Sequence, residues 1–151
     1  MRNEIFVSTE PTVLIQSVRE LLCIDNSNIE YDSDHKIFRS KKEKKFITEF
    51  VLTKNAKSDT FTYILNYVQN FYENNVASVS RTIVIYNFNY ISISKYPLFK
   101  FMFENYSSSF RFVLTSTYVP QVISSFFNLN IIQSEEMTDF NSLIEHDVNE
   151  L

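Results

Sequence analysis

The residues best placed to do chemistry in this chain stand at the end of a short apolar run, Thr82 to Phe88. The β-branched composition of this run is typical of a buried parallel strand. In nucleotide-hydrolysing α/β proteins such a strand commonly ends in Asp or Asp-Glu, which bind Mg²⁺ and its water. Here those two positions hold Tyr86 and Asn87. We therefore expect an inert strand end without metal-binding acids, which also offers part of a partner surface.

Glycine is absent from all 151 residues. A phosphate-binding loop of the form G-x-x-x-x-G-K-[ST] needs glycine, because its backbone N–H groups must approach the phosphates closely. A dinucleotide-binding fingerprint needs glycine for the same reason. The sequence therefore excludes both motifs, and its turns must use Asn, Asp and Ser, which tolerate a left-handed backbone better than other side chains.

The other reactive residue types are few and scattered. Neither His35 nor His146 has metal-ligand spacing to another His or Cys. Cys23 ends an apolar helical stripe, which predicts a small buried side chain rather than a nucleophile. One cysteine also rules out an internal disulfide and fits an intracellular chain. No segment approaches the 18 apolar residues of a membrane span, and the N-terminus lacks the apolar core of a signal peptide.

Charge is unevenly spread along the chain, although the net charge is only −4. Residues 36–57 are rich in lysine, whereas residues 112–151 have no Lys or Arg and contain six carboxylates. The densest basic run holds Lys41, Lys42, Lys44 and Lys45. This run is a candidate contact for DNA or phosphate, or a nuclear-import signal. The alternative is a solvated hairpin and a frayed acidic terminus.

Helical and strand patterns alternate along the chain. Apolar residues at helical spacing predict helices over 11–23, 58–72, 94–105 and 120–127, with a weak terminal helix over 139–148. Strand patterns cover 46–52, 82–88, 110–115 and 130–133, and 29–31 with 36–38 predict a two-stranded excursion. The alternation predicts an α/β fold with three layers, in which helices flank a mostly parallel sheet.

Ligands of such sheets bind at the carboxyl ends of the strands. The polar residues at these ends are Tyr86, Asn87, Thr115, Ser116 and Thr117. They mark the edge where a binding site is expected, if the chain has one of this type.

Four motifs follow one another in the segment from Arg81 to Asn130. They are Ile83-Val84-Ile85-Tyr86-Asn87, Phe103-Glu104-Asn105-Tyr106-Ser107, Arg111-Phe112-Val113-Leu114 and Pro120-Gln121-Val122-Ile123. In this order and spacing the segment resembles the AAA+ ATPase domain of clamp-loader subunits. The likeness is greatest to the small subunits of replication factor C and weaker to the bacterial delta-prime subunit. It covers about a third of the chain.

The resemblance implies a P-loop NTPase-like or AAA+-like core without a functional P-loop. Residues 1–151 would then be a single truncated AAA+-like domain, without the family's lid and collar domains. The phosphate-loop region is reduced to Phe6–Pro11, which has no Gly or Lys, and the acidic pair has become Tyr86-Asn87. The sensor Asn falls on Thr117, and the Ser-Arg-Cys finger falls on Asn128-Leu129-Asn130. Because all these groups are missing, the resemblance implies neither catalysis nor a cofactor.

The sequence therefore predicts a non-catalytic clamp-loader-like subunit or scaffold in a DNA replication or repair assembly. Its expected partners are other clamp-loader-like subunits or a sliding clamp. No membrane contact is expected. DNA is a further, weak ligand in this prediction, through the lysine run and through Lys100, which lies where the family has a basic residue. The alternative for Lys100 is a solvated lysine without a ligand. The expected location is intracellular, and nuclear in a eukaryote. The alternative is a protein-interaction module derived from the AAA+ fold with no replication role.

Overall fold

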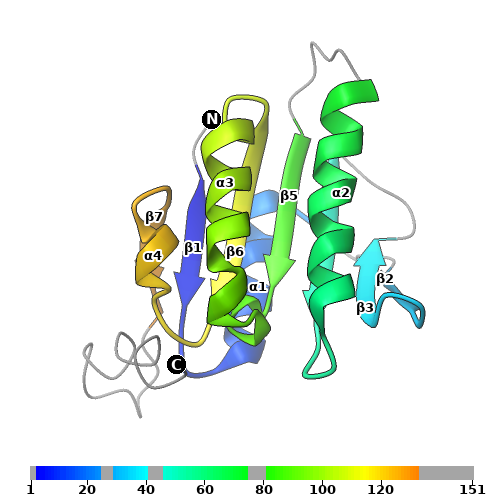
Figure 1. Ribbon diagram of the computed structural model, residues 1–151. Helices are drawn as coiled ribbons and strands as arrows, with labels where there is room; N and C mark the ends of the chain where they lie inside the picture. Colours follow the sequence, from blue (N-terminus) through cyan, green and yellow to red (C-terminus); the bar gives the residue numbers. More distant parts are fainter. Residues whose placement is uncertain (1–2, 25–28, 41–45, 75–80, 133–151) are drawn as a thin grey trace.

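The computed structural model describes residues 3–24, 29–40, 46–74 and 81–132 (Figure 1). These residues form a sheet of seven strands in the order β2-β3-β4-β5-β6-β1-β7. The strands are β1 (Glu4–Val7), β2 (Ile29–Asp32), β3 (Ile37–Ser40), β4 (Ile47–Leu52), β5 (Arg81–Tyr86), β6 (Phe110–Ser116) and β7 (Asn128–Ile131). The strands β4, β5, β6, β1 and β7 pair in parallel, and only β2–β3 and β3–β4 are antiparallel. The predicted α/β class with a mostly parallel sheet is confirmed.

Helices cover both faces of the sheet (Figure 1). The helices α2 (Ser58–Asn74), α3 (Tyr96–Tyr106) and α4 (Gln121–Ser124) lie over one face, and α1 (Pro11–Leu22) lies over the other. Two short 3₁₀ turns, η1 (Phe88–Tyr90) and η2 (Ile93–Lys95), connect β5 to α3. Pro11 occupies the first turn of α1, where its missing N–H costs nothing, and Cys23 ends the helix in the left-handed region at φ 55°.

The core has two parts because successive residues of a strand point to opposite faces. In β5, Ile83 and Ile85 pack under α2 and α3, whereas Val84 and Tyr86 pack under α1. Phenylalanines dominate the larger part. Phe103 packs on Phe112 and Phe127 with ring centroids 5.0 and 4.9 Å apart and near-perpendicular rings. Such edge-on aromatic pairs add stability beyond the area that they bury.

Several features differ from the sequence-based expectation. The strand β1 was not predicted, although all four of its residues are buried. The helix expected over 120–127 has only four residues, because Phe127 turns into the core and β7 begins at Asn128, two residues before the strand predicted there. Cys23 is exposed, so the prediction that it is buried was wrong. The terminal helix expected over 139–148 and His146 lie outside the described residues.

Candidate functional site

The carboxyl ends of the parallel strands meet at one edge of the sheet, where α/β proteins bind their ligands. We call this the carboxyl edge; it is the lower edge of the sheet in Figure 1. The connection after β1 begins with Ser8, that after β5 with Asn87 and that after β6 with Thr117. These are the positions at which the resemblance to clamp-loader ATPases would place nucleotide chemistry.

Tyr86 points away from the carboxyl edge and into the layer beneath α1. The residue is 0% exposed, and its hydroxyl donates a hydrogen bond to Glu49 Oε2 at 2.5 Å. Glu49, on the neighbouring strand β4, is 3% exposed, and Arg19 Nε on α1 lies 4.0 Å from the same oxygen. The position that would hold a metal-binding acid therefore belongs to a buried Arg19–Glu49–Tyr86 cluster, and the expectation that Tyr86 forms part of a partner surface was wrong.

Burial holds the Tyr86 phenol in its neutral form. Desolvation raises the pKa of Tyr86 far above the ordinary tyrosine value, and the hydrogen bond to Glu49 and the charge of its carboxylate raise it further. A neutral phenol that donates a hydrogen bond to a carboxylate carries no negative charge that could bind a metal ion. The hydroxyl instead satisfies the Glu49 carboxylate, which would be costly to bury alone.

Asn87 closes the end of β5 by bonding to both neighbouring strands. Its backbone is left-handed, with φ 63° and ψ 44°. Its N–H donates to Thr115 Oγ1 of β6 at 2.9 Å, and its Nδ2 donates to the Leu52 carbonyl of β4 at 3.1 Å. Asparagine tolerates this backbone better than most residues, and its short amide reaches the adjacent chain end. Through its backbone N–H and its side-chain amide, Asn87 thus links the ends of β4, β5 and β6.

The connection between β1 and α1 is short and largely bonded to the protein itself. Only Ser8, Thr9 and Glu10 separate Val7 from Pro11. The Ser8 N–H donates to the Ser116 carbonyl at 3.2 Å, and the Glu10 N–H donates to Ser8 Oγ at 3.2 Å. A phosphate loop presents such N–H groups to its ligand. Here two of them are already bonded within the chain.

Thr117, where the resemblance would place the sensor residue, also bonds to a neighbouring connection. The Thr117 N–H donates to Asn89 Oδ1 at 3.3 Å, across the space between the connections after β5 and β6. Thr115 and Ser116, the other polar residues predicted at this edge, are 0% exposed. The structure therefore brings Asn87, Thr115 and Thr117 together, as the sequence suggested. It uses them as links between strand ends.

The resemblance motif on α3 and β6 has packing roles. Ser107 accepts a hydrogen bond from Asn3 Nδ2 at 2.9 Å and donates to the Phe103 carbonyl at 2.5 Å. Tyr106 packs edge-on against Tyr72 of α2. Arg111 Nη2 lies 2.9 Å from Glu4 Oε2, which links β6 to β1 on the face that α1 covers. These contacts give each of these residues a packing or linking role in the fold.

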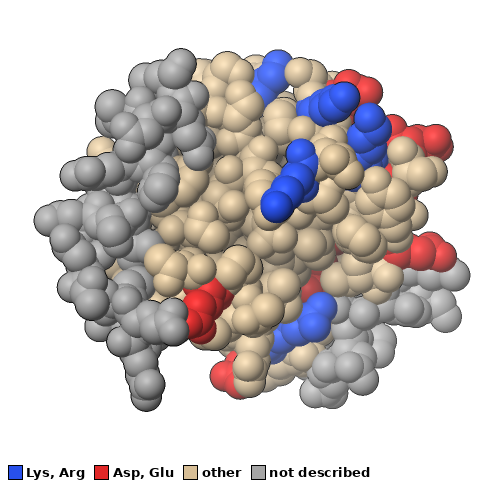
Figure 2. Space-filling model, turned by 90° about the horizontal axis from the view of Figure 1, so that it is seen from below, with Lys and Arg blue, Asp and Glu red and all other residues tan. Residues whose placement is uncertain are grey.

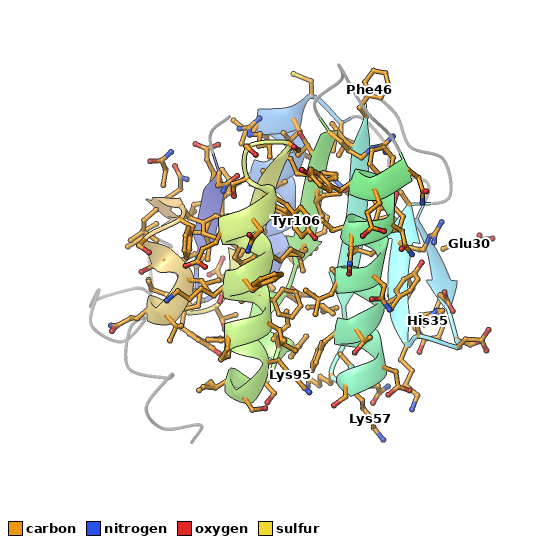
Figure 3. All side chains as sticks on the ribbon, turned by 45° about the horizontal axis from the view of Figure 1, so that its top comes forward. Glu30, His35, Phe46, Lys57, Lys95 and Tyr106 are labelled. Atoms are coloured by element: carbon orange, nitrogen blue, oxygen red, sulfur yellow. The ribbon has the colours of Figure 1, made fainter. Side chains whose placement is uncertain are left out.

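Lysines lie on the carboxyl edge where α2 and α3 begin. Lys54 and Lys57 are exposed in the connection from β4 to α2, and Lys95 directly precedes α3. Figure 2 shows Lys and Arg side chains over this part of the edge, and Figure 3 labels Lys57 and Lys95 at the adjoining ends of the two helices. The sequence reasoning did not single out Lys95. Its position in the first turn of the helix predicted over 94–105 was the available signal.

The remaining basic candidates do not join this group. Lys100 is exposed on α3, beyond the first turn of the helix. The predicted DNA contacts Lys41, Lys42, Lys44 and Lys45 lie outside the described residues. Within the described ranges no group of three or more His, Cys, Asp or Glu is placed to hold a metal ion.

His35 has a structural environment beside the N-terminal part of α2. Its Nδ1 lies 2.7 Å from Asp32 Oδ2, and its ring stacks on Tyr63 of α2 with centroids 3.9 Å apart. The hydrogen bond from His35 lowers the pKa of Asp32. The Thr60 hydroxyl of α2 donates to the His35 carbonyl at 2.6 Å. These contacts dock the turn between β2 and β3 onto α2, beside which His35 is labelled in Figure 3.

No helix in the described part of the chain is long and apolar enough to cross a bilayer. No protein-family model matches the chain, and a search of curated proteins finds no significant match.

Proposed function

We propose that this chain is a non-catalytic clamp-loader-like subunit or scaffold of a DNA replication or repair assembly. Its role would be to pack against other clamp-loader-like subunits or a sliding clamp, without hydrolysing ATP. The proposal builds on the motif resemblance between Arg81 and Asn130, and the arrangement of the strands supports it.

The order of the parallel strands is the observation that carries the proposal. Numbered along the chain, the five parallel strands β1, β4, β5, β6 and β7 lie in the order 2-3-4-1-5. Dinucleotide-binding and flavodoxin-like sheets place their first and second strands side by side. Here two strands, β5 and β6, separate them. The order therefore differs from those of the dinucleotide-binding and flavodoxin-like sheets, and it supports the proposal of an AAA+-like core.

The carboxyl edge supports the inactive form of the proposal. Catalysis of phosphoryl transfer needs a phosphate cradle, metal-binding acids and a cation for the developing charge. The first is replaced by three residues between β1 and α1, and the second by buried Tyr86 and bridging Asn87. Asn128–Asn130, at the place of the arginine finger, form part of strand β7. The same side chains that would do chemistry in the family bond to neighbouring strands in this chain.

The decisive experiment is purification of the tagged chain from its own cells, with mass spectrometry of the bound proteins. Recovery of clamp-loader subunits or a sliding clamp is the expected result. Recovery of unrelated proteins only, or of none, would refute the replication role and favour an interaction module derived from the same fold. A variant with Phe101→Glu on the exposed face of α3 controls for unspecific apolar capture, because Phe101 is 59% exposed.

Calorimetry with Mg-ATP tests the loss of the nucleotide site separately. We expect no magnesium-dependent binding, because the N–H groups of Ser8 and Glu10 are bonded within the chain and no group of three or more His, Cys, Asp or Glu in the described ranges is placed to hold a metal ion. Tight binding that disappears with EDTA would contradict the proposed inactive site, even if the partner experiment succeeded.

DNA binding is the remaining part of the proposal. We expect the lysines at the carboxyl edge, the run 41–45 and Lys100 to bind backbone phosphates. Every lysine–phosphate interaction that a substitution removes should reduce the slope of log affinity against log salt by about 0.7–0.9. A variant with Lys54, Lys57 and Lys95 changed to Glu, compared with one changed at Lys41, Lys42, Lys44 and Lys45, tells which group binds. An unchanged slope in both would remove DNA from the proposal.

A further inference from the structure

Helix α2 carries a four-residue pattern that repeats three times. An aromatic residue is followed three positions later by asparagine in each repeat: Tyr63 and Asn66, Tyr67 and Asn70, Phe71 and Asn74. Because a helical turn has 3.6 residues, side chains four apart lie one above the other along a helix. The pattern therefore places an aromatic row and an amide row side by side over more than two turns of α2.

Both rows line one groove. The groove has a volume of about 340 Å³ and lies along α2, with Arg39 of β3 as its lining residue from the sheet. This is within the usual size range of ligand sites. Arg39 donates a hydrogen bond to the Tyr63 hydroxyl, so its guanidinium is anchored at the groove.

The aromatic row is occupied by contacts within the protein. Each ring already has an imidazole or a guanidinium over its face. The pairs are His35 on Tyr63 at 3.9 Å between centroids, Arg39 on Tyr67 at 5.9 Å, and Arg81 on Phe71 at 4.1 Å from guanidinium carbon to centroid. A nucleic acid base would have to displace these groups before it could stack. The row therefore serves packing and does not favour single-stranded nucleic acid as the ligand.

The amide row has hydrogen-bonding groups to spare. Asn66 and Asn70 are exposed, and no hydrogen bond of their side chains is found among the described residues. Asn74 donates to the Asn70 carbonyl at 2.9 Å. An amide offers two donors and an acceptor, which match the carbonyl and N–H groups of a peptide. Residues four apart on a helix are about 6 Å apart along its axis, close to the roughly 6.6–6.8 Å that two residues of an extended chain span.

Arg39 is the cation of the groove, and it also lines a neighbouring hollow with Glu30 and Asp32 of β2. It is the one charged residue among the described lining residues of the groove itself. A guanidinium has five N–H donors, and the Tyr63 hydroxyl takes one of them. The others suit a carboxylate, which arginine binds through two parallel hydrogen bonds.

We propose that the groove between β3 and α2 binds an extended peptide segment that carries an acidic side chain. Asn66 and Asn70 hydrogen-bond its backbone, and Arg39 pairs with its carboxylate. This proposal does not depend on the replication role, because it rests on α2 and β3 rather than on the carboxyl edge.

Peptide selection on the full chain tests the proposal. A phage library of random dodecamers is selected on the wild-type chain and counter-selected on the Asn66→Ala, Asn70→Ala double variant. Gln69→Ala is the matched control, because Gln69 is an exposed amide on the same helix that does not line the groove. Melting temperatures confirm that the variants fold, which is expected for exposed positions.

We expect the enriched peptides to contain Asp or Glu and to bind Gln69→Ala as tightly as wild type. Loss of two backbone hydrogen bonds should weaken binding roughly tenfold in the double variant, and Arg39→Gln should weaken it by roughly tenfold or more. The proposal is overturned if no peptide is enriched, if enriched peptides bind the double variant equally well, or if they lack acidic residues. Binding of a dT12 oligonucleotide that depends on Asn66 and Asn70 would overturn it in favour of nucleic acid.

Discussion

Removal of the Tyr86 hydroxyl tests whether its buried contact with Glu49 stabilises the fold. In Tyr86→Phe, the Glu49 carboxylate loses a donor at 2.5 Å while the residue remains almost fully buried. A hydrogen bond to a charged group contributes about 1.5–3 kcal/mol. We therefore expect the free energy of unfolding to fall by about 2 kcal/mol, or Tm by about 4–8 °C for a chain of this length.

Urea denaturation followed by circular dichroism at 222 nm measures this effect in a double-mutant cycle. Glu49→Leu alone leaves the buried Tyr86 hydroxyl without an acceptor, whereas the double variant removes both partners. The double variant should therefore lose less free energy of unfolding than the sum of the two single variants, by about 1 kcal/mol or more. Tyr90→Phe is the control, because Tyr90 is half-buried and no hydroxyl hydrogen bond is found for it among the described residues. A Tyr86→Phe loss under about 0.5 kcal/mol, or strictly additive single losses, would refute the reasoning.

High pH should lower the stability of the wild-type protein through the same cluster. The loss of stability should be smaller in Tyr86→Phe. An unfolded tyrosine ionises near pH 10, whereas burial raises the pKa of folded Tyr86 well above that value. The folded state therefore keeps a proton that the unfolded state releases, so the stability is fully present below about pH 10 and is lost as the pH rises further. Urea midpoints between about pH 9 and 11 test this. Parallel curves for the two proteins would contradict it.

Two smaller predictions concern single residues. Asn87→Ala should cost about 1 kcal/mol more than Asn87→Gly in urea unfolding, because both lose the side-chain hydrogen bond but only glycine accepts φ 63° without penalty. Equal losses would show that the backbone conformation is not the constraint. The bond from His35 lowers the pKa of Asp32, so its stabilising effect is present above about pH 4 and is lost as the pH falls through the lowered pKa. Asp32→Asn should flatten this acid-side fall in Tm, and an unchanged profile would speak against the contact.

The long periodic segments were predictable from the sequence. The helix expected over 58–72 is α2, Ser58–Asn74, and the strand expected over 82–88 is β5, Arg81–Tyr86. Their apolar patterns are pronounced because α2 buries a continuous stripe of side chains and β5 is buried on both faces. Asn87 ends β5 earlier than expected, since its left-handed backbone leaves the strand there.

The strand β1 and the direction of Tyr86 were not predictable in the same way. The strand β1 has only four residues and begins with a glutamate, so its own sequence is a weak signal for a buried strand. It is buried because β6 and β7 pair with it on either side. A strand buried on both faces shows no alternation that would reveal where each side chain points. The choice of the α1 side for Tyr86 follows from its distant partner Glu49, which no local pattern indicates.

The position of β1 also sets the time at which this protein can complete its fold during synthesis. Its edges pair with β6 and β7, and Asn130 Nδ2 bonds to the Ile5 carbonyl, 125 positions away. At roughly 5–20 residues per second, the first strand would wait about 6–25 s before its last partner is made. Until β6 and then β7 are made, the edges of an apolar strand are unpaired, and such edges are prone to aggregation. The strand β1 is therefore the first part of the sheet to be translated and one of the last to be paired on both edges.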